Sequence, residues 1–555
     1  MVLKTPQDFE VHGLEDIQPA YADFPGKMYA GTLPTNNGSR RGEMMFWMFE
    51  PDTQLVPESM VIWLNGGPGC SSFNCGIMME HSPVTQPLHA AGYCCLKPTP
   101  DLSINEHTWT KATTMLYVEQ PIGTGFSYGD PLPETERDAA GDIDAFLQNF
   151  YGVFEHLKPY DFFIFGESYA GMFVPSFTRF IHLRNQKAIE DRDESRFLVP
   201  LKGAALGNGW VDGKIQGPAT IDYSWWHGLI DKPTRDALHT QWNNCMYQLG
   251  TENDVEPPPF HPFNVQDDCG MMWGILQAAG NPNAYDITTW DPNVDQITFT
   301  SEGFYNTPAV IESLHAPTNI TWHGCRWGEG RRRLVSAQQL EQHRRLYMDN
   351  DRPLSVVPYI AEVLDAGIPV LVYNGDRDMT TNMVGQELTL NAMEWSGKDD
   401  WLDAPRGLWK VNDYPAGWTK EHKGLTFIVV YNSGHMVPYN QAAPAYDLVT
   451  RFLKGQSYMD TVLPAIRIKA LDTTEAKGQT NMFESTILDA SVLPTLATST
   501  TPAIENTLFL NASQWELIGV AAVSMIVGFS LAVFFLGKRA GIRKGRYQPV
   551  PDADI

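Results

Sequence analysis

Several classes of protein are excluded by features that this sequence lacks. It contains no internal repeat and no Cys-x-x-Cys pair, and no cysteine stands at zinc-ligand spacing from a histidine. Basic residues are scarce: Lys and Arg number 40 against 65 Asp and Glu, and the body of the chain has no basic stripe. An acidic surface repels nucleic acid. We therefore expect no metal, no organic cofactor and no nucleic-acid partner.

The formal net charge of −25 has two interpretations. It fits plain solubility, and it also fits an enzyme of an acidic lumen, where part of the charge would be neutralised. The cysteine count of 7 is odd, so at least one thiol stays unpaired. Free thiols in a cytosolic enzyme are one explanation. However, three N-x-S/T sequons, at Asn37, Asn319 and Asn511, favour an oxidising, glycosylating compartment.

The N-terminus lacks an apolar run typical of a signal peptide. Near the other end, residues Leu517–Leu536 carry no charge over a length that spans a hydrocarbon core. Five basic residues follow: Lys538, Arg539, Arg543, Lys544 and Arg546. The positive-inside rule then predicts one transmembrane helix over 517–536, a cytoplasmic tail over 537–555 and a lumenal body. A buried core helix is the alternative. The lumenal topology needs a targeting segment, which we expect upstream of this start.

Six short apolar runs bounded by Gly- or Pro-rich turns predict buried strands. They lie at residues 60–64, 114–118, 162–165, 204–206, 369–373 and 426–430. Amphipathic stretches alternate with them, which favours an α/β fold with a mostly parallel sheet covered by helices on both faces. A segment from about 212 to 358, rich in Trp, Pro, Asn and Cys, predicts an inserted cap. Residues 456–516, rich in Thr, Ser, Ala and Pro from about 474, predict a flexible stalk.

The strongest single signal is the segment Asp161–Gly171. An apolar strand runs into Gly-x-Ser-x-Ala-Gly, centred on Ser168, and a helix-compatible stretch follows from Met172 to about Arg184. A nucleophile elbow requires this strand–turn–helix context, with small residues around the serine because the turn is sharp. The pattern therefore predicts that Ser168 is a nucleophile.

Two later loops supply candidate partners for Ser168. One strand ends in Asn374-Gly-Asp376-Arg-Asp378, and another ends in Asn432-Ser-Gly-His435. The chain order Ser, Asp, His is that of α/β-hydrolases. His435 would accept the serine proton, and an aspartate would orient the imidazole. Either Asp376 or Asp378 could do so, because sequence physics alone does not decide between them.

Five motifs in this order resemble the serine carboxypeptidase family. They read WLNGGPGCSS (63–72), EQPIGTGFSY (119–128), GESYAG (166–171), NGDRD (374–378) and GHMVP (434–438). The resemblance covers residues 15–455 and implies an α/β-hydrolase fold with an inserted cap. It also implies a serine-type peptidase that removes residues from peptide C-termini through an acyl-enzyme, best at acidic pH.

The resemblance assigns roles to individual residues. The implied triad is Ser168, Asp378 and His435, and the implied oxyanion hole is formed by the N–H groups of Gly67 and Tyr169. Recognition of the substrate's terminal carboxylate is assigned to five residues: Trp63, Asn65, Gly66, Glu167 and, as the second glutamate, Glu80. A glutamic acid can face a carboxylate if the two share a proton, which favours acidic pH.

The chain departs from the family pattern at several positions. Glu119 and Thr381 stand where Asp and Cys are usual, and Glu80 comes one residue late after an apparent insertion at Asn74-Cys75. The implied disulfides are Cys70–Cys325, from core to cap, and Cys245–Cys269, within the cap. Cys75 is then left to pair with Cys94 or Cys95.

Three functions remain open at this point. The first is a membrane-anchored lumenal carboxypeptidase, with a layout like that of Golgi enzymes of the family that trim basic residues. The second is an acyltransferase on the same scaffold, although Asn65 and Glu167 favour peptide carboxylates. The third is a non-catalytic protective or binding protein, whose signature would be a lost triad residue, and none is lost. The sequence does not indicate the oligomeric state.

Overall fold

The computed structural model describes residues 4–36, 38, 40–51, 58–86, 102–248, 271–290, 301–325 and 355–463. These belong to the first of two compact units, residues 1–468. The predicted transmembrane helix, the tail, most of the stalk, and the sequons at Asn37 and Asn511 lie outside the described residues. Within the described ranges, no helix combines the length and apolar character needed to cross a bilayer.

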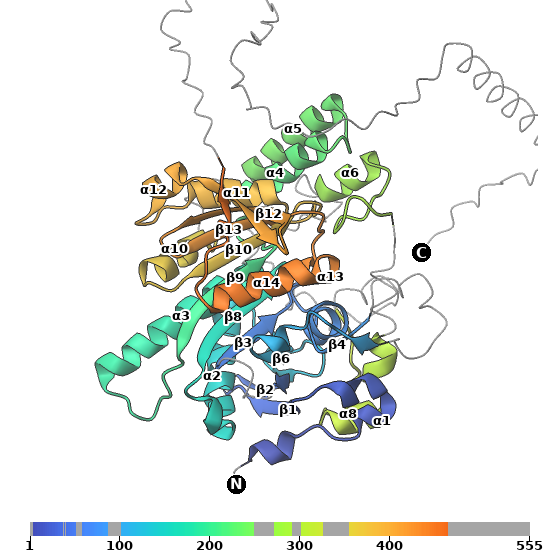
Figure 1. The fold of residues 1–555 in the computed structure, drawn as a ribbon, viewed down its shortest axis with the longest axis vertical. Coiled ribbons are helices and arrows are strands. Elements are labelled where there is room, and N and C mark those ends of the chain that lie inside the picture. The colour runs from blue at the N-terminus through green and yellow to red at the C-terminus, as the bar shows by residue number, and fades with distance from the viewer. Residues whose placement is uncertain are drawn as a thin grey trace, which may run out of the picture. The chain divides into compact units, whose positions relative to one another are not determined.

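A 12-stranded mixed sheet forms the centre of the fold (Figure 1). The strand order is β1-β2-β6-β3-β8-β9-β10-β13-β12-β11-β14, with β7 paired to β2. The strands are β1 (Lys27–Pro34), β2 (Arg41–Glu50), β3 (Ser59–Leu64), β6 (Thr114–Val118), β7 (Tyr128–Asp130), β8 (Asp161–Glu167), β9 (Leu201–Gly207), β10 (Val370–Gly375), β11 (Arg406–Val411), β12 (Tyr414–His422), β13 (Leu425–Val430) and β14 (Thr461–Val462). The six central strands from β6 to β13 are parallel, and the outer pairings on both sides are antiparallel.

All six predicted strands are present in this parallel centre. Each is buried on both faces, which is why it appears in the sequence as a continuous apolar run. The antiparallel edge strands were not predicted. β12 mixes exposed, half-buried and buried positions and contains Lys, Glu and His, so no apolar run marks it.

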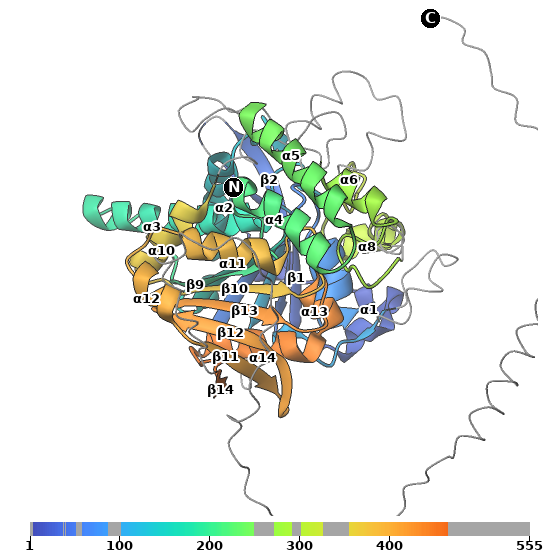
Figure 2. The same ribbon diagram turned by 90° about the horizontal axis from the view of Figure 1, so that it is seen from above.

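Helices cover both faces of the sheet. Along β8, Phe162 and Ile164 join one core with α2 (Glu136–Val153), α3 (Ala170–Asp191) and α10 (Val357–Asp365), whereas Phe163 and Phe165 join a second core with α14 (Ala442–Leu453). Successive strand side chains point to opposite faces, so one strand serves both cores. Figure 2 shows β9, β10 and β13 between α10 on one side and α14 on the other.

The described part of the chain between β9 and α10 is helical. It contains α4 (Gly213–Trp226), α5 (Lys232–Gln248), α6 (Met271–Ala278) and α8 (Pro308–Ser313). Shorter helices elsewhere are α1 (Leu14–Ile17), α11 (Met383–Ala392), α12 (Lys398–Asp403) and α13 (Val437–Asn440), and β4 (Val84–Thr85) pairs with β5 (Ser103–Ile104). The helical segment interrupts the run of parallel strands where the sequence predicts the cap.

The packed domain continues beyond Gly455, which is its predicted end. β14 pairs with β11, and the buried side chain of Tyr458 donates a hydrogen bond of 2.6 Å to the carbonyl of Leu448. The stretch from 456 to 463 is therefore part of the domain and not of the stalk. A single buried aromatic residue in a polar stretch gives too weak a periodic signal to predict this.

Candidate active site

Ser168 lies at a sharp turn between β8 and α3. Its φ is 66°, in the left-handed region that costs a non-glycine residue about 1–2 kcal/mol. The turn is held by three backbone bonds: the Ser168 N–H donates to Gly207 O at 3.0 Å, and its carbonyl accepts from Gly171 and Trp210 N–H, both at 2.9 Å. These bonds offset the strain and fix the predicted nucleophile at the end of a buried strand.

The small residues around Ser168 are required by close approaches. A Cβ on Gly171 would lie 2.5 Å from the backbone nitrogen of Trp210, and one on Gly166 would lie 2.7 Å from the carbonyl oxygen of Leu64. Both distances are shorter than atomic contact allows. The Gly-x-Ser-x-Ala-Gly pattern thus reflects the fit of the elbow against the loops that follow β3 and β9.

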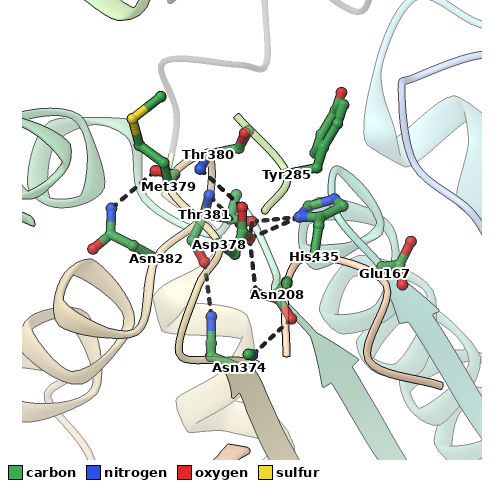
Figure 3. Close-up of polar contacts among 12 residues, drawn as sticks. Glu167, Asn208, Tyr285, Asn374, Asp378, Met379, Thr380, Thr381, Asn382 and His435 are labelled. Atoms are coloured by element: carbon green, nitrogen blue, oxygen red, sulfur yellow. Dashed lines mark hydrogen bonds and ion pairs between the residues drawn. The ribbon is translucent and has the colours of Figure 1, made fainter. Parts of the chain in front are cut away.

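The side chains of His435 and Asp378 form a buried pair beside this turn. The distance from His435 Nδ1 to Asp378 Oδ2 is 2.7 Å, and their side chains are 5% and 0% exposed (Figure 3). They follow β13 and β10, which are neighbouring parallel strands, so their loops meet at one edge of the sheet. Among the described residues no hydrogen bond joins Ser168 to His435, and such bonds commonly tighten only with substrate bound.

Asp376, the alternative left open by the sequence, does not contact the imidazole. Its carboxylate accepts the backbone N–H of Ser433 at 3.1 Å, and the Arg377 N–H donates to Ser433 O at 2.8 Å. Burial raises the pKa of the Asp376 carboxyl. The structure therefore pairs Asp378 with His435 and uses Asp376 to brace the loop that carries the histidine.

Asp378 is held by several hydrogen-bond donors that were not predicted from the sequence. Its Oδ2 accepts from Asn208 Nδ2 at 2.7 Å and from Thr381 Oγ1 at 2.8 Å, and its Oδ1 accepts from Thr380 N–H at 2.9 Å. Asn208 directly follows β9, the parallel neighbour of β10. A polar residue at the carboxyl end of the adjacent strand was the signal that could have indicated it.

The glycine-rich loop after β3 reaches the elbow. A Cβ on Gly66 would lie 2.3 Å from the Tyr169 nitrogen, and Gly67 has a φ of 107°, which only glycine adopts freely. Gly67 and Tyr169, whose N–H groups are predicted to form the oxyanion hole, therefore stand on two segments in direct backbone contact.

Glu119 joins this loop to the cap. Its carboxylate accepts from Ser71 Oγ at 2.5 Å, from Trp322 Nε1 at 2.6 Å and from Phe126 N–H at 2.6 Å. The Ser71 N–H donates to Gly324 O at 2.8 Å. The buried carboxylate thus has three donors, and the unusual Glu at this position ties the end of β6 to both the glycine-rich loop and the cap.

A Cys70–Cys325 disulfide reinforces the same junction, as the family resemblance implies. Cys245 is also disulfide-bonded, and its expected partner Cys269 lies outside the described residues. Cys75 is free among the described residues, and Cys94 and Cys95, the partners left open for it, lie outside them. Asn319, the one described sequon, is exposed in a turn.

Removing the Cys70–Cys325 disulfide should destabilise the protein. It closes a loop of 255 residues, and cross-links over long loops contribute about 4–5 kcal/mol through the unfolded chain. We expect Cys70→Ser/Cys325→Ser to unfold at clearly lower urea concentration and to lose activity before global unfolding, because the glycine-rich loop is released. Urea titrations followed by Trp fluorescence and by activity test this, and coincident curves would contradict the second part.

Next to the elbow lies a second buried cluster, built on Asn65. Its Oδ1 accepts from Trp63 Nε1 at 2.7 Å and from Gly76 N–H at 3.2 Å, which fixes the amide orientation. Its Nδ2 therefore faces Glu167 Oε1 at 3.4 Å and Glu80 Oε1 at 3.5 Å. The structure thus brings together four predicted carboxylate-binding residues, with the Trp63 indole acting through Asn65.

Glu80 reaches this cluster despite its displaced position in the sequence. Residues Phe73–Glu80 form the π-helix η3, in which Ile77 N–H bonds Ser72 O and His81 N–H bonds Gly76 O. A π-helix accommodates one extra residue per turn. The insertion at Asn74-Cys75 is absorbed in this way, and the side chain of Glu80 still faces Asn65.

The two glutamic acids interact closely. Burial, and then the neighbouring charge of Glu80, raise the pKa of Glu167 well above its usual range, and burial also raises the pKa of Glu80. Apart from the contact between the two carboxyls themselves, no donor among the described residues reaches Oε2 of either side chain. Two buried carboxyls that hydrogen-bond each other do not readily ionise together, so the pair retains a proton.

Comparisons with known proteins identify the family to which the chain is similar. The sequence profile of the serine carboxypeptidase family matches residues 19–455. The chain is 28% identical over 476 residues to pheromone-processing carboxypeptidase KEX1 of Paracoccidioides brasiliensis (strain Pb03), covering 81% of this chain and 68% of that protein. It is 30% identical over 448 residues to serine carboxypeptidase-like 48 of Arabidopsis thaliana, covering 79% and 80%. A match to pheromone-processing carboxypeptidase KEX1 of Coprinopsis cinerea, 28% identical, covers 99% of this chain and 85% of that protein.

The fold is also shared with a solved structure. The crystal structure of Kex1(delta)p, a prohormone-processing carboxypeptidase from Saccharomyces cerevisiae, matches with a TM-score of 0.65 and 24% identity, over 82% of this chain and 97% of that one. It has the α/β-hydrolase arrangement predicted from the sequence. With most of its length matched by the family profile, the chain belongs to the serine carboxypeptidase family.

Proposed function

We propose that this serine carboxypeptidase hydrolyses the last peptide bond of peptides and proteins through an acyl-enzyme on Ser168. The observation that carries the proposal is the buried cluster directly beside the elbow, in which Asn65 Nδ2 faces the carboxyls of Glu80 and Glu167 and these two carboxyls interact with each other. A general hydrolase has no need of paired acids there. A free substrate carboxylate would complete the cluster by sharing the retained proton.

The reaction follows from the side-chain chemistry. His435 takes the proton of Ser168 as its Oγ attacks the scissile carbonyl, and Asp378 holds the imidazole and stabilises its charged form. The N–H groups of Gly67 and Tyr169 would stabilise the oxyanion. His435 then protonates the leaving amine, and water hydrolyses the acyl-enzyme by the same steps in reverse order.

The cellular setting is proposed from the remaining sequence features. A stalk ahead of 517–536, that transmembrane helix and a short basic tail would hold the domain of residues 15–463 in an acidic lumen of the secretory pathway. The Cys70–Cys325 disulfide supports an oxidising compartment. The proposal includes a processing role in trimming basic C-terminal residues, and the similarity to pheromone-processing carboxypeptidases supports such a role.

Peptides differing in their last residue test the activity. We expect the purified full chain to release one C-terminal residue at a time from peptides ending in Lys, Arg, Leu or Phe, faster at about pH 5 than at about pH 7. Mass spectrometry of the products identifies the terminal residue that is preferred. Transfer of the acyl group to an added alcohol without hydrolysis would instead indicate an acyltransferase, and intact peptides with a folded protein would indicate a binding role.

A further inference from the structure

Thr381 lies inside the hydrogen-bond network of the proposed triad. The side chain is buried, with Oγ1 at 2.8 Å from Asp378 Oδ2 and 3.3 Å from His435 Nδ1. Its backbone is fixed as well, because Asn374 Nδ2 donates to Thr381 O at 2.8 Å. Figure 3 shows Thr381 next to Asp378, with His435 on the other side of the carboxylate, and family members usually carry a cysteine at the position of Thr381.

The hydroxyl can serve only one of these neighbours as a donor. Asp378 Oδ2 accepts hydrogen bonds and is the nearer atom, so the Thr381 proton points to the carboxylate. A hydrogen-bond donor to a carboxylate stabilises the negative charge of that carboxylate. Less of this charge is then available to stabilise a protonated imidazole beside it. A neutral imidazole is the form that accepts the Ser168 proton. The Thr381 hydroxyl should therefore favour the reactive form in acid.

Other charged and titratable groups surround the pair, and none replaces this bond. They come from the loop after β10, from η3, β8, α4 and the cap segment after α6: Asp376, Arg377, Glu80, Glu167, Tyr223, Tyr285 and Asp286. Tyr285 packs its ring 4.8 Å from that of His435 and accepts the His435 backbone N–H at 2.7 Å. No described side chain other than Asn208, Thr381 and His435 bonds Asp378 Oδ2.

We propose that Thr381 is a positioning residue whose hydroxyl occupies one acceptor site of Asp378 Oδ2, fixes the carboxylate against His435 and extends the reactivity of Ser168 to lower pH. The inference rests on the proposed triad. A thiol is a much weaker donor than a hydroxyl, so a cysteine at this position would supply less of this effect.

Labelling of Ser168 by a fluorophosphonate tests the proposal without involving the carboxylate-binding cluster. The rate would be measured from acid to neutral pH for the full chain and for Thr381→Val, Thr381→Ser and Thr381→Cys. We expect Thr381→Val to react roughly 10-fold more slowly in acid. The acidic limb of its profile of labelling rate against pH should move to higher pH. Thr381→Ser should match the wild type, and Thr381→Cys should lie between the two.

A matched control separates this role from the loss of any buried hydroxyl. Thr389 in α11 is also fully buried, and its Oγ1 donates to Gly385 O at 2.7 Å. Thr389→Val should leave the limb in place, and near-ultraviolet circular dichroism checks the fold of each variant. The proposal is overturned if the acidic limb of Thr381→Val lies at the same pH as that of the wild type, or if the variant loses rate equally at every pH. A wild-type chain that is labelled but cleaves no peptide overturns the carboxypeptidase activity alone.

Discussion

Replacing Ser168 by alanine should lower kcat for a peptide substrate by roughly 10⁴-fold to 10⁶-fold while KM changes little. Among the described residues of the elbow, the Ser168 hydroxyl is the one group placed to form the acyl-enzyme. The cluster of Asn65, Glu80 and Glu167 that would bind the terminal carboxylate stays intact, so the variant should still bind peptide.

The measurement is steady-state release of the terminal residue, with peptide binding to Ser168→Ala followed by calorimetry. Ser176→Ala is the matched control, because Ser176 lies in the same helix α3 and its buried hydroxyl donates only to Met172 O. It should keep near-normal kcat. Substantial activity in Ser168→Ala would contradict the proposed nucleophile, and loss of peptide binding would contradict the separate carboxylate site.

Raising the pH should weaken substrate binding more than it slows the chemical step. Burial raises the pKa of both side chains, and the charge of Glu80 raises that of Glu167 further, so the pair keeps a proton in acid and loses it only above the usual carboxyl range. Once the proton is lost, the doubly charged pair repels the substrate carboxylate. KM should then rise by about tenfold per pH unit, while kcat stays nearly level.

Peptides with an amidated C-terminus provide the control, since they have no carboxylate to be repelled. Their weaker cleavage should show no such rise in KM. Glu80→Gln and Glu167→Gln each remove the second ionisation, so both variants should lose most of the alkaline rise in KM. An equal pH dependence for free and amidated peptides would refute the role of the pair.

The parts of the fold that the sequence predicts correctly are those with a local pattern. The central strands are buried on both faces and therefore form unbroken apolar runs, and the elbow at Ser168 needs small residues at fixed offsets. The antiparallel edge strands such as β12 mix polar and apolar residues, and β14, which pairs with β11, has two exposed residues. Such elements depend on distant partners and leave little local signal.

The candidate site divides in the same way. Motif order indicates Ser168, Asp378 and His435, but sequence spacing alone left Asp376 open and made Glu80 doubtful. The distance of 2.7 Å to His435 distinguishes the two aspartates, and the π-helix η3 returns Glu80 to the cluster by absorbing one residue. Both results come from backbone geometry across loops that lie far apart in the chain.

The sequence by itself determined the α/β class and the order of the loops that carry Ser168, Asp378 and His435, and it predicts the nucleophile, because each rests on short-range periodicity or on a strained turn with fixed neighbours. Only the tertiary structure decided which polar side chains meet. Asn208 and Thr381 come within hydrogen-bonding distance of Asp378 because β9 and β10 are parallel neighbours and the loop after β10 folds back on itself. Such contacts between loop ends are set by sheet topology, which no local pattern encodes.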